Sequence, residues 1–302
     1  MKLVSMKLEG VNRAGVVVGA EVANVTGLLA MSNQGRAGAR TFEDALDVLR
    51  GPSLVEASMN RLARDHGFAA QCREARVLIS LSEVKLNPPV LEPGKILAVG
   101  LNYAAHAAEQ GGQPPEFPLI FTKCVTALLP PEEAIRLPRV SDEIDYEGEL
   151  AVVIGREAKS VRAAEAFDYV AGYTIMNDVT ARDLQRRERQ WTRAKGLDTF
   201  APCGPWLVTK DEIPDPHALD LELRVNGELR QKSNTSDLIF KVPELIEFIS
   251  QDLTLLPGDI VSTGTPSGVG VYRDPPVFLR PGDEIEIEIG RIGKLRNPVG
   301  VG

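Results

Sequence analysis

A proline-rich segment, residues 86–94, divides this chain into two parts of unlike pattern. It holds three prolines and a glycine in nine residues, a composition typical of a linker between domains. We therefore predict a small N-terminal α/β domain over residues 1–85 and a larger domain over residues 86–302. At 302 residues the chain is long enough to form two such cores.

The larger part is rich in short apolar runs that predict strands, whereas the smaller part mixes strands with helices. Asn226-Gly227 lies between two alternating runs and predicts a two-residue hairpin. In the smaller part, Thr41 has the character of a helix N-cap, and Gly67 that of a residue ending a helix that begins at Ser53. The pattern predicts an α+β fold that is mainly β. In the larger part we expect a helix over 243–249 and strands over 96–100, 150–155, 169–175, 219–225, 259–262 and 283–289.

The composition argues against several classes of partner. There are 42 acidic side chains against 34 basic ones, a formal charge of -8, and no run of five Lys or Arg, so we expect no nucleic-acid or membrane binding. No apolar stretch approaches the roughly 20 residues that cross a bilayer, and the first residues lack the apolar core of a secretory signal. Three cysteines without a C-x-x-C pair fit a reducing compartment. We expect a cytoplasmic protein.

Three carboxylates fall at the ends of two predicted strands. Glu147 and Glu149 are two residues apart, so on a strand they share one face, next to the apolar run 150–154. Asp178 follows the apolar run 169–175. Three such acids, in a chain with only three histidines, would form a hard oxygen site of the kind that Mg²⁺ or Mn²⁺ prefers. The spacing alone also fits a solvated strand edge.

Four motifs, in order, resemble those of the fumarylacetoacetate hydrolase superfamily. They are GLNYAAHAAE at 100–109, EGE at 147–149, NDVTARDLQ at 177–185 and GTPSGVG at 264–270. The resemblance covers roughly residues 95–300 and leaves the first 85 or so as an N-terminal extension. It implies a mixed β-roll core, a homodimer, and Mg²⁺- or Mn²⁺-dependent chemistry on a small keto acid.

The resemblance assigns the three carboxylates as metal ligands. Glu147, Glu149 and Asp178 match the ligand positions of the family, the same three residues that the strand spacing brings together. Asn102 stands near the position where the founding eukaryotic enzyme has a further acidic ligand. An amide there puts a fourth ligand in doubt and implies a three-carboxylate site of the acylpyruvase type.

A histidine and a glutamate in the first motif form a candidate general base. His106 and Glu109 are three residues apart and would lie on one face of a helix, where the carboxylate can fix the imidazole tautomer and the pair can activate water. A surface histidine beside an unrelated glutamate is the alternative. The resemblance also assigns Tyr103 to substrate binding. Gly111 and Gly112 follow directly and predict a hinged lid.

The resemblance extends to further residues around the metal. Lys195 and Gln185 match groups that polarise the carbonyl under attack, and Lys123 matches a lysine close to the metal that would contact substrate. Either lysine could instead be a solvated surface charge. Backbone amides of the glycine-rich turn at Gly264, with the hydroxyl of Thr265, would hold the carboxylate of an α-keto acid.

Together these residues imply a hydrolase that cleaves a C–C bond in a β-diketo acid. The substrate would be an acylpyruvate, a fumarylpyruvate or a 2,4-diketo-3-deoxy sugar acid, and the products pyruvate or another α-keto acid and a carboxylic acid. Decarboxylation of an oxaloacetate-like β-keto acid, or the isomerase and decarboxylase chemistry of aromatic catabolism, would use the same site. A binding protein on a vestigial scaffold would lack one of the three metal-binding carboxylates or the His106–Glu109 pair, and all of these are present. The run Arg186-Arg187-Glu188-Arg189 fits either a second substrate carboxylate or a solvated helix face.

Overall fold

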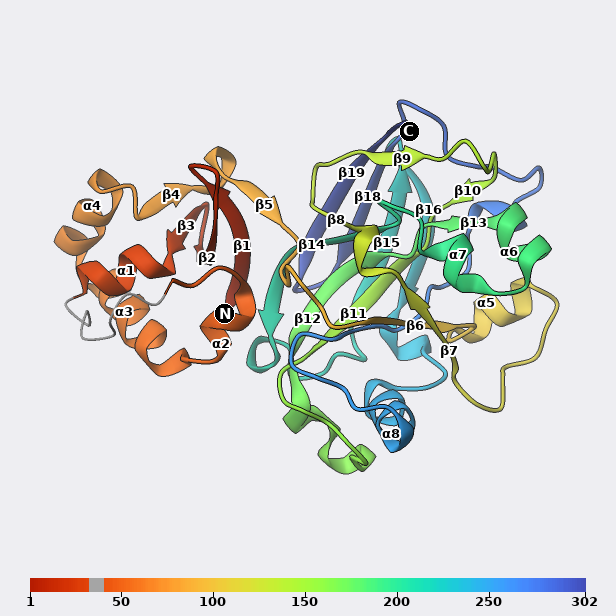
Figure 1. The fold of residues 1–302 in the computed structure, drawn as a ribbon, viewed down its shortest axis with the longest axis horizontal. Coiled ribbons are helices and arrows are strands. Elements are labelled where there is room, and N and C mark those ends of the chain that lie inside the picture. Colours follow the sequence, from red (N-terminus) through yellow and green to blue (C-terminus); the bar gives the residue numbers. More distant parts are fainter. Residues whose placement is uncertain (33–40) are drawn as a thin grey trace.

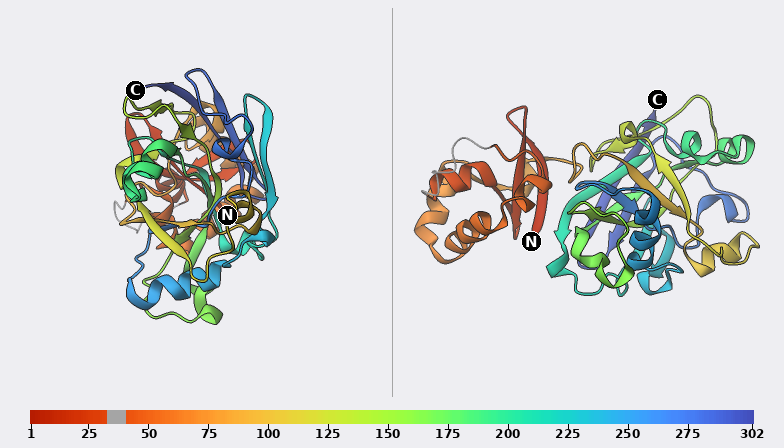
Figure 2. Two further views of the ribbon diagram at one scale, coloured as in Figure 1. Left: turned by 90° about the vertical axis from the view of Figure 1, so that its right-hand side faces the viewer. Right: turned by 60° about the horizontal axis from the view of Figure 1, so that its bottom comes forward.

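The computed structural model describes residues 1–32 and 41–302, which form two lobes of unequal size (Figure 1). The smaller lobe, red to orange, contains the N-terminus, and the larger lobe contains the C-terminus. The right-hand view of Figure 2 shows the same division. Among the described residues, no helix is long and apolar enough to cross a membrane.

The smaller lobe is an antiparallel sheet covered by helices. Its strands have the order β4-β3-β2-β1, and α1, α3 and α4 surround an apolar core that includes Leu28, Leu62, Phe68 and Cys72. The strands are β1 (Lys2–Leu8), β2 (Val11–Val18), β3 (Glu21–Asn24) and β4 (Leu78–Ser80). The helices are α1 (Val25–Met31), α2 (Ala45–Leu49), α3 (Pro52–Arg64) and α4 (His66–Glu74).

Two predicted helix boundaries in this lobe are wrong. Asp44, rather than Thr41, caps α2, because its carboxylate accepts a hydrogen bond from the backbone N–H of Asp47. Gly67 lies inside α4 and does not end a helix. Asp65 makes the break instead, since its backbone is extended and its carboxylate caps α4. In both places a short acidic side chain that can bond the nearby backbone sets the boundary.

Strand pairing continues from the smaller lobe into the larger one. β5 (Lys85–Asn87) pairs with β1, and β1 pairs with β14 (Ala201–Thr209). The proline-rich segment therefore starts beside a sheet that runs through both lobes. The domain boundary at residue 86 stays a prediction.

The larger lobe contains two main sheets. The first continues from β14 through β12 (Val170–Asn177), β11 (Gly148–Ile154), β17 (Ile260–Ser262) and β6 (Ile96–Gly100) to β7 (Leu119–Lys123). The second has the order β16 (Glu228–Asn234), β15 (Asp220–Val225), β18 (Glu284–Ile289), β19 (Gly293–Val301) and β9 (Ile135–Leu137). Short strands β8 (Leu128–Leu129), β10 (Ile144–Asp145) and β13 (Thr180–Ala181) complete the set. The α+β class, mainly β, is confirmed, as are the strands predicted for this part.

The two sheets pack closely at Gly148, between Glu147 and Glu149. A Cβ at this position would lie 3.3 Å from Ile287 Cγ2 of β18 and 3.3 Å from Leu223 Cδ1 of β15. Glycine therefore lets the second sheet approach the strand that carries the two glutamates. This explains physically why a residue without a side chain separates the two acids.

The predicted hairpin and helix are also formed. β15 and β16 are joined by Asn226 and Gly227, whose φ angles of 53° and 79° are the left-handed pair that a tight hairpin turn requires. The predicted helix extends over Val242–Asp252 as α8. Helices α5 (Ala104–Glu109), α6 (Arg182–Glu188) and α7 (Trp191–Lys195) lie together on the side of the larger lobe away from the N-terminus (Figure 1).

Candidate metal and active site

Three buried carboxylates meet where β11 begins and β12 ends. Gly148 pairs with Asn177 across the two strands, so the flanking Glu147 and Asp178 are neighbours. Glu147, Glu149 and Asp178, called the triad below, each offer an oxygen within 4.8 Å of the others, and none is more than 4% exposed. The acids are therefore assembled away from solvent, which excludes the solvated strand edge.

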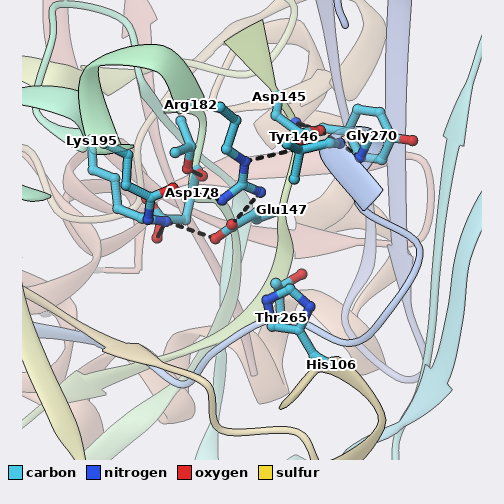
Figure 3. Close-up of polar contacts among 12 residues, drawn as sticks. His106, Asp145, Tyr146, Glu147, Asp178, Arg182, Lys195, Thr265 and Gly270 are labelled. Atoms are coloured by element: carbon cyan, nitrogen blue, oxygen red, sulfur yellow. Dashed lines mark hydrogen bonds and ion pairs between the residues drawn. The ribbon is translucent and has the colours of Figure 1, made fainter. Parts of the chain in front are cut away.

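Three cationic side chains contact the triad, and Figure 3 shows two of them, Lys195 and Arg182, beside Glu147 and Asp178. Lys195 Nζ, at the end of α7, lies 2.8 Å from Glu147 Oε2 and 2.6 Å from Asp178 Oδ2. Lys123 Nζ, at the end of β7, lies 2.5 Å from Asp178 Oδ1. Arg182 Nη2, at the start of α6, lies 2.6 Å from Glu147 Oε1. These contacts are mutually dependent, because either partner left alone would be a charge removed from water.

The surrounding charges shift the pKa values of two triad acids in opposite directions. Burial by itself would raise the pKa of Glu147, but the charges of Lys195 and Arg182 outweigh it and lower the pKa to about 2. Burial raises the pKa of Glu149 well above its usual value, and repulsion from Asp178 and Glu147 adds to the rise. The positive charges around the triad therefore do not compensate the negative charge of Glu149.

The contacts of Glu149 show how the triad would accept a cation. Its Oε2 accepts hydrogen bonds from Ser262 Oγ at 2.6 Å and from the backbone N–H of Gly264 at 3.0 Å. No Lys or Arg within the described part of the chain forms an ion pair with it. A divalent cation held by oxygens of Glu147, Glu149 and Asp178 would offset the repulsion, so the residues present fit a hard ion such as Mg²⁺ or Mn²⁺.

The predicted histidine–glutamate pair is formed on α5. His106 Nδ1 lies 3.0 Å from Glu109 Oε2, and Glu109 Oε1 accepts a hydrogen bond from the backbone N–H of Gly268 at 2.9 Å. Gln110 Nε2 lies 2.9 Å from His106 Nε2. With that amide as donor, Nδ1–H donates to Glu109 and Nε2 keeps a lone pair, the tautomer that a general base needs. His106 is 4% exposed, which excludes a surface histidine.

The triad, His106 and Lys195 line one small cavity. Its volume is about 220 Å³, the scale of a small organic acid. Thr265 and Gln185 also line it; Thr265 Oγ1 accepts a hydrogen bond from Gln231 Nε2 at 2.8 Å. The apolar part of the wall comes from Val99, Leu101, Phe121, Trp191 and Tyr272. The cavity thus combines charge at one part of its wall with apolar surface for a short hydrocarbon chain.

Three predicted substrate-binding residues are not among the residues that line the cavity. Lys123 contacts Asp178, and Gly264 donates its N–H to Glu149. Tyr103 is fully buried, its hydroxyl has no hydrogen-bond partner among the described residues, and burial together with the charge of Glu149 raises its pKa. The first two support the triad, and contact of all three with substrate stays a prediction.

Two residues that sequence reasoning missed hold the triad in place. Arg182 Nε lies 2.9 Å from Asp145 Oδ2, and the carboxylate of Asp145 accepts hydrogen bonds from the backbone N–H groups of Tyr146 and Gly270 (Figure 3). Arg182 is three residues before Gln185, so their shared helix face was a usable signal. Asp145 gave no such signal, because its partners Arg182 and Gly270 are 37 and 125 residues away.

Asn102 is committed to the backbone around it. Its Nδ2 donates to the carbonyl oxygens of Thr263 at 2.7 Å and Phe240 at 3.0 Å, and its Oδ1 accepts from the N–H of Phe240 at 2.7 Å. It is fully buried, and its hydrogen bonds connect the end of β6 to the segment after β17 and to the segment before α8. This matches the expectation that the amide does not replace an acidic ligand. The lid predicted from Gly111 and Gly112 stays a prediction.

Comparison with known proteins adds to this geometry. The family model described as fumarylacetoacetate (FAA) hydrolase C-terminal matches residues 95–300. The chain is 46% identical over 253 residues to the mitochondrial oxaloacetate tautomerase Fahd2a of Rattus norvegicus, covering 82% of this chain and 81% of the rat protein. It is 50% identical over 227 residues to the oxaloacetate tautomerase YisK of Bacillus subtilis, covering 74% and 75%. A solved fumarylacetoacetate hydrolase from Exiguobacterium antarcticum has a TM-score of 0.79 and 33% identity, with both chains covered in full.

Proposed function

Because the chain belongs to the fumarylacetoacetate hydrolase family, we propose that it is a divalent-cation-dependent enzyme of a small keto acid, and that it catalyses the keto–enol tautomerisation of oxaloacetate or a close analogue. The two curated relatives at 46% and 50% identity are named for this reaction. The single observation that carries the proposal is the position of His106 Nε2, a base with a lone pair, in the same small cavity as the triad.

Tautomerisation requires a base at carbon and positive charge at the carbonyl oxygen. His106 Nε2 would remove a proton from C3 of the keto acid, after the side chain of Gln110 gives way, and the C–H electron pair would become the C2=C3 double bond. Glu109 stabilises the resulting imidazolium through Nδ1–H. A bound divalent cation would supply Lewis-acid stabilisation of the negative charge developing at the carbonyl.

The ammonium of Lys195 would face the same oxygen from the cavity wall. Its pKa is raised, because the carboxylates of Asp178 and Glu147 outweigh the opposite effect of burial, so Lys195 stays a cation. One proton leaves C3 and one arrives on the oxygen from solvent, so the reaction needs no co-reactant. The reverse reaction, enol to keto, uses the same groups in the opposite order.

Hydrolysis of a β-diketo acid is the second candidate, and the His106–Glu109 pair favours it. The same lone pair can deprotonate a water, whose oxygen would attack the distal carbonyl while the bond between C3 and that carbonyl carbon breaks. Gln185 and Lys195 line the cavity where they could stabilise the oxyanion. The solved neighbour from Exiguobacterium antarcticum is named as a hydrolase. Both reactions pass through an enolate at C3, which is why one site can support either.

A substrate panel separates these reactions. The purified protein with Mg²⁺ or Mn²⁺ is given oxaloacetate, acetopyruvate and fumarylpyruvate, and the enol absorbance, carboxylic acid products and CO₂ are followed separately. We expect faster enol–keto exchange of oxaloacetate and no release of CO₂ above the protein-free rate. Cleavage of an acylpyruvate at a higher kcat/KM would establish the hydrolase instead, and CO₂ release would establish a decarboxylase. The choice of Mg²⁺ or Mn²⁺, the homodimer and the cytoplasmic location stay predictions.

A further inference from the structure

We propose that Arg186 gives this enzyme its preference for dicarboxylic keto acids, by binding the carboxylate at the end of the substrate away from the triad. The inference rests on the proposed function, because it names the substrate class of the same cavity. It arises from the arginine-rich run 186–189, for which the sequence favoured a solvated helix face over a substrate role.

The cavity has three Lys or Arg side chains in the described part of its wall, and the three differ in the burial of the carboxylates that they pair with. Lys195 contacts two triad acids, and Arg182 is held by Glu147 and Asp145, so both of these charges are neutralised inside the protein. Arg186 contacts the carboxylate of Glu143, which lies nearer the surface. It is therefore the cavity cation that can exchange its partner without leaving a buried acid unpaired.

Helix geometry places Arg186 at a suitable distance from the triad. Arg182, Gln185 and Arg186 are spaced i, i+3 and i+4 on α6, so they share the face that lines the cavity. Four residues along an α-helix correspond to a rise of about 6 Å, so the Arg186 backbone is about one turn beyond Arg182, which contacts the triad. A four-carbon keto acid with one end at the triad would extend along this face.

The rest of the arginine run differs from Arg186. Arg187 pairs with the adjacent Glu188 at 3.0 Å, its side chain is 64% exposed, and it does not line the cavity. Arg189 also lies outside the cavity wall. The run thus combines one cavity residue with two exposed residues, Arg187 on the helix and Arg189 just after its end. This gives a control for Arg186 on the same helix, with the same charge and a similar surface ion pair.

The ion pair between Arg186 and Glu143 is weak enough for the guanidinium to bind a substrate carboxylate instead. Their atoms are 2.5 Å apart, and the side chains are 56% and 30% exposed, so solvent screens the attraction. The backbone carbonyl of Glu143 accepts a hydrogen bond from the N–H of Arg182 at 2.9 Å, which fixes Glu143 beside the start of α6. A guanidinium matches the planar fork of a carboxylate, so a substrate carboxylate can replace Glu143 as its partner.

The test compares Arg186→Gln with Arg187→Gln on two substrates of similar size. Oxaloacetate carries the distal carboxylate, and acetopyruvate has an acetyl group in its place. We expect Arg186→Gln to raise KM for oxaloacetate about tenfold or more, the scale of one charge-assisted hydrogen bond, with acetopyruvate changed less than about twofold. Arg187→Gln should change neither. An equal loss on both substrates, or no loss on oxaloacetate, would overturn the inference.

A binding measurement separates this inference from the proposed reaction. Difluoro-oxaloacetate has no proton at C3 and cannot enolise, so its binding to the Mg²⁺-loaded protein by calorimetry needs no turnover. We expect Arg186→Gln to weaken its binding about tenfold relative to wild type, and Arg187→Gln to leave it unchanged. If oxaloacetate is not tautomerised but this difference is found, the arginine assignment stands and the proposed reaction fails. If both variants bind as wild type does, the assignment fails whatever the reaction.

Discussion

The two lobes handle charge in opposite ways. In the described residues 1–32 and 41–85, no Asp, Glu, Lys or Arg is buried, and the core is apolar apart from a few serines and an asparagine. The larger lobe buries a cluster of acids and bases in contact with one another. Its members are Lys123, Asp145, Glu147, Glu149, Asp178, Arg182 and Lys195. Buried charge is costly, so its concentration in one lobe marks the place where the fold serves chemistry.

The difference also shows how the larger lobe tolerates that charge. The cluster has four carboxylates, Asp145 and the triad, against three cations, Lys123, Lys195 and Arg182, so its formal charge is -1 and would become +1 with one divalent cation. We expect substitutions in the cluster to alter activity and stability strongly, and matched surface substitutions in the smaller lobe to alter little.

The largest effect is expected for Glu149→Gln. Loss of a cation ligand should reduce the rate at least about a thousandfold, because Lewis-acid stabilisation contributes several kcal/mol and each 1.36 kcal/mol is tenfold. Without added cation, the variant should unfold at the same temperature as wild type or higher, since a repelled charge is removed. Activity assays and thermal melts check both, with the exposed Glu74→Gln as control. If the variant without cation unfolded at a clearly lower temperature than wild type, the loss of activity would reflect a structural role of Glu149.

A smaller loss is expected for His106→Gln. Removing the general base should cost about a hundredfold in rate, the lower end of the usual range, while the cation still binds at the triad. The stabilisation of the fold by Mg²⁺ or Mn²⁺ in a thermal melt should therefore match that of wild type. Retention of full tautomerase activity would show that another group takes the proton.

The contrast in stability is sharpest between Lys123→Met and Arg73→Met. Lys123 is buried against Asp178, and removing one partner of a buried pair costs about 3 to 5 kcal/mol in the free energy of unfolding. Arg73 pairs with Glu21 across exposed surface of the smaller lobe, at 2.7 Å, and its loss should produce no measurable change. Denaturant unfolding measures both. Equal effects of the two variants would break the contrast between the lobes.

The smallest expected effect is on the pH dependence of stability, to which Glu147 and Glu149 contribute with opposite sign. The pKa of Glu149 is raised in the folded state above its ordinary value of 4.5. The stability contributed by the protonated form is therefore lost as the pH rises from 4.5 toward the raised pKa. The pKa of Glu147 is lowered to about 2, so its contribution is present above 4.5 and is lost as pH falls toward 2.

Unfolding of wild type and Glu149→Gln between about pH 4 and 8 without cation isolates the Glu149 part. The free-energy difference, wild type minus variant, should fall as pH rises, and added Mg²⁺ should reverse this trend because the ion binds the deprotonated acid. A difference that does not vary with pH would contradict the raised pKa.

The sequence predicted which acids come together, and the pairing of His106 with Glu109, because the signals are local. A two-residue spacing brings Glu147 and Glu149 onto one face, and a three-residue spacing brings His106 to Glu109, so periodicity is enough. The apolar run 169–175 placed Asp178 at a second strand end, and the resemblance added Lys195 and the other site residues. The structure brings Asp178 and Lys195 to the two glutamates.

What the sequence could not predict depends on contacts between distant segments. The pairing of Asp145 with Arg182 and Gly270 exists only after β10, α6 and the glycine-rich turn have come together. The same holds for Gly264 and Lys123, whose donors are turned toward triad acids rather than into the cavity. Motif position shows that these residues are near the site and does not show which way they face.

The most direct test of a cation-dependent keto-acid enzyme is the rate at which enol-oxaloacetate relaxes to the keto form, followed by ultraviolet absorbance in stopped flow. Wild-type protein with Mg²⁺ or Mn²⁺ should accelerate this relaxation, a chelator should abolish the acceleration, and Glu149→Gln should not restore it. A relaxation rate with cation-loaded wild type equal to that of protein-free buffer would contradict the proposed reaction.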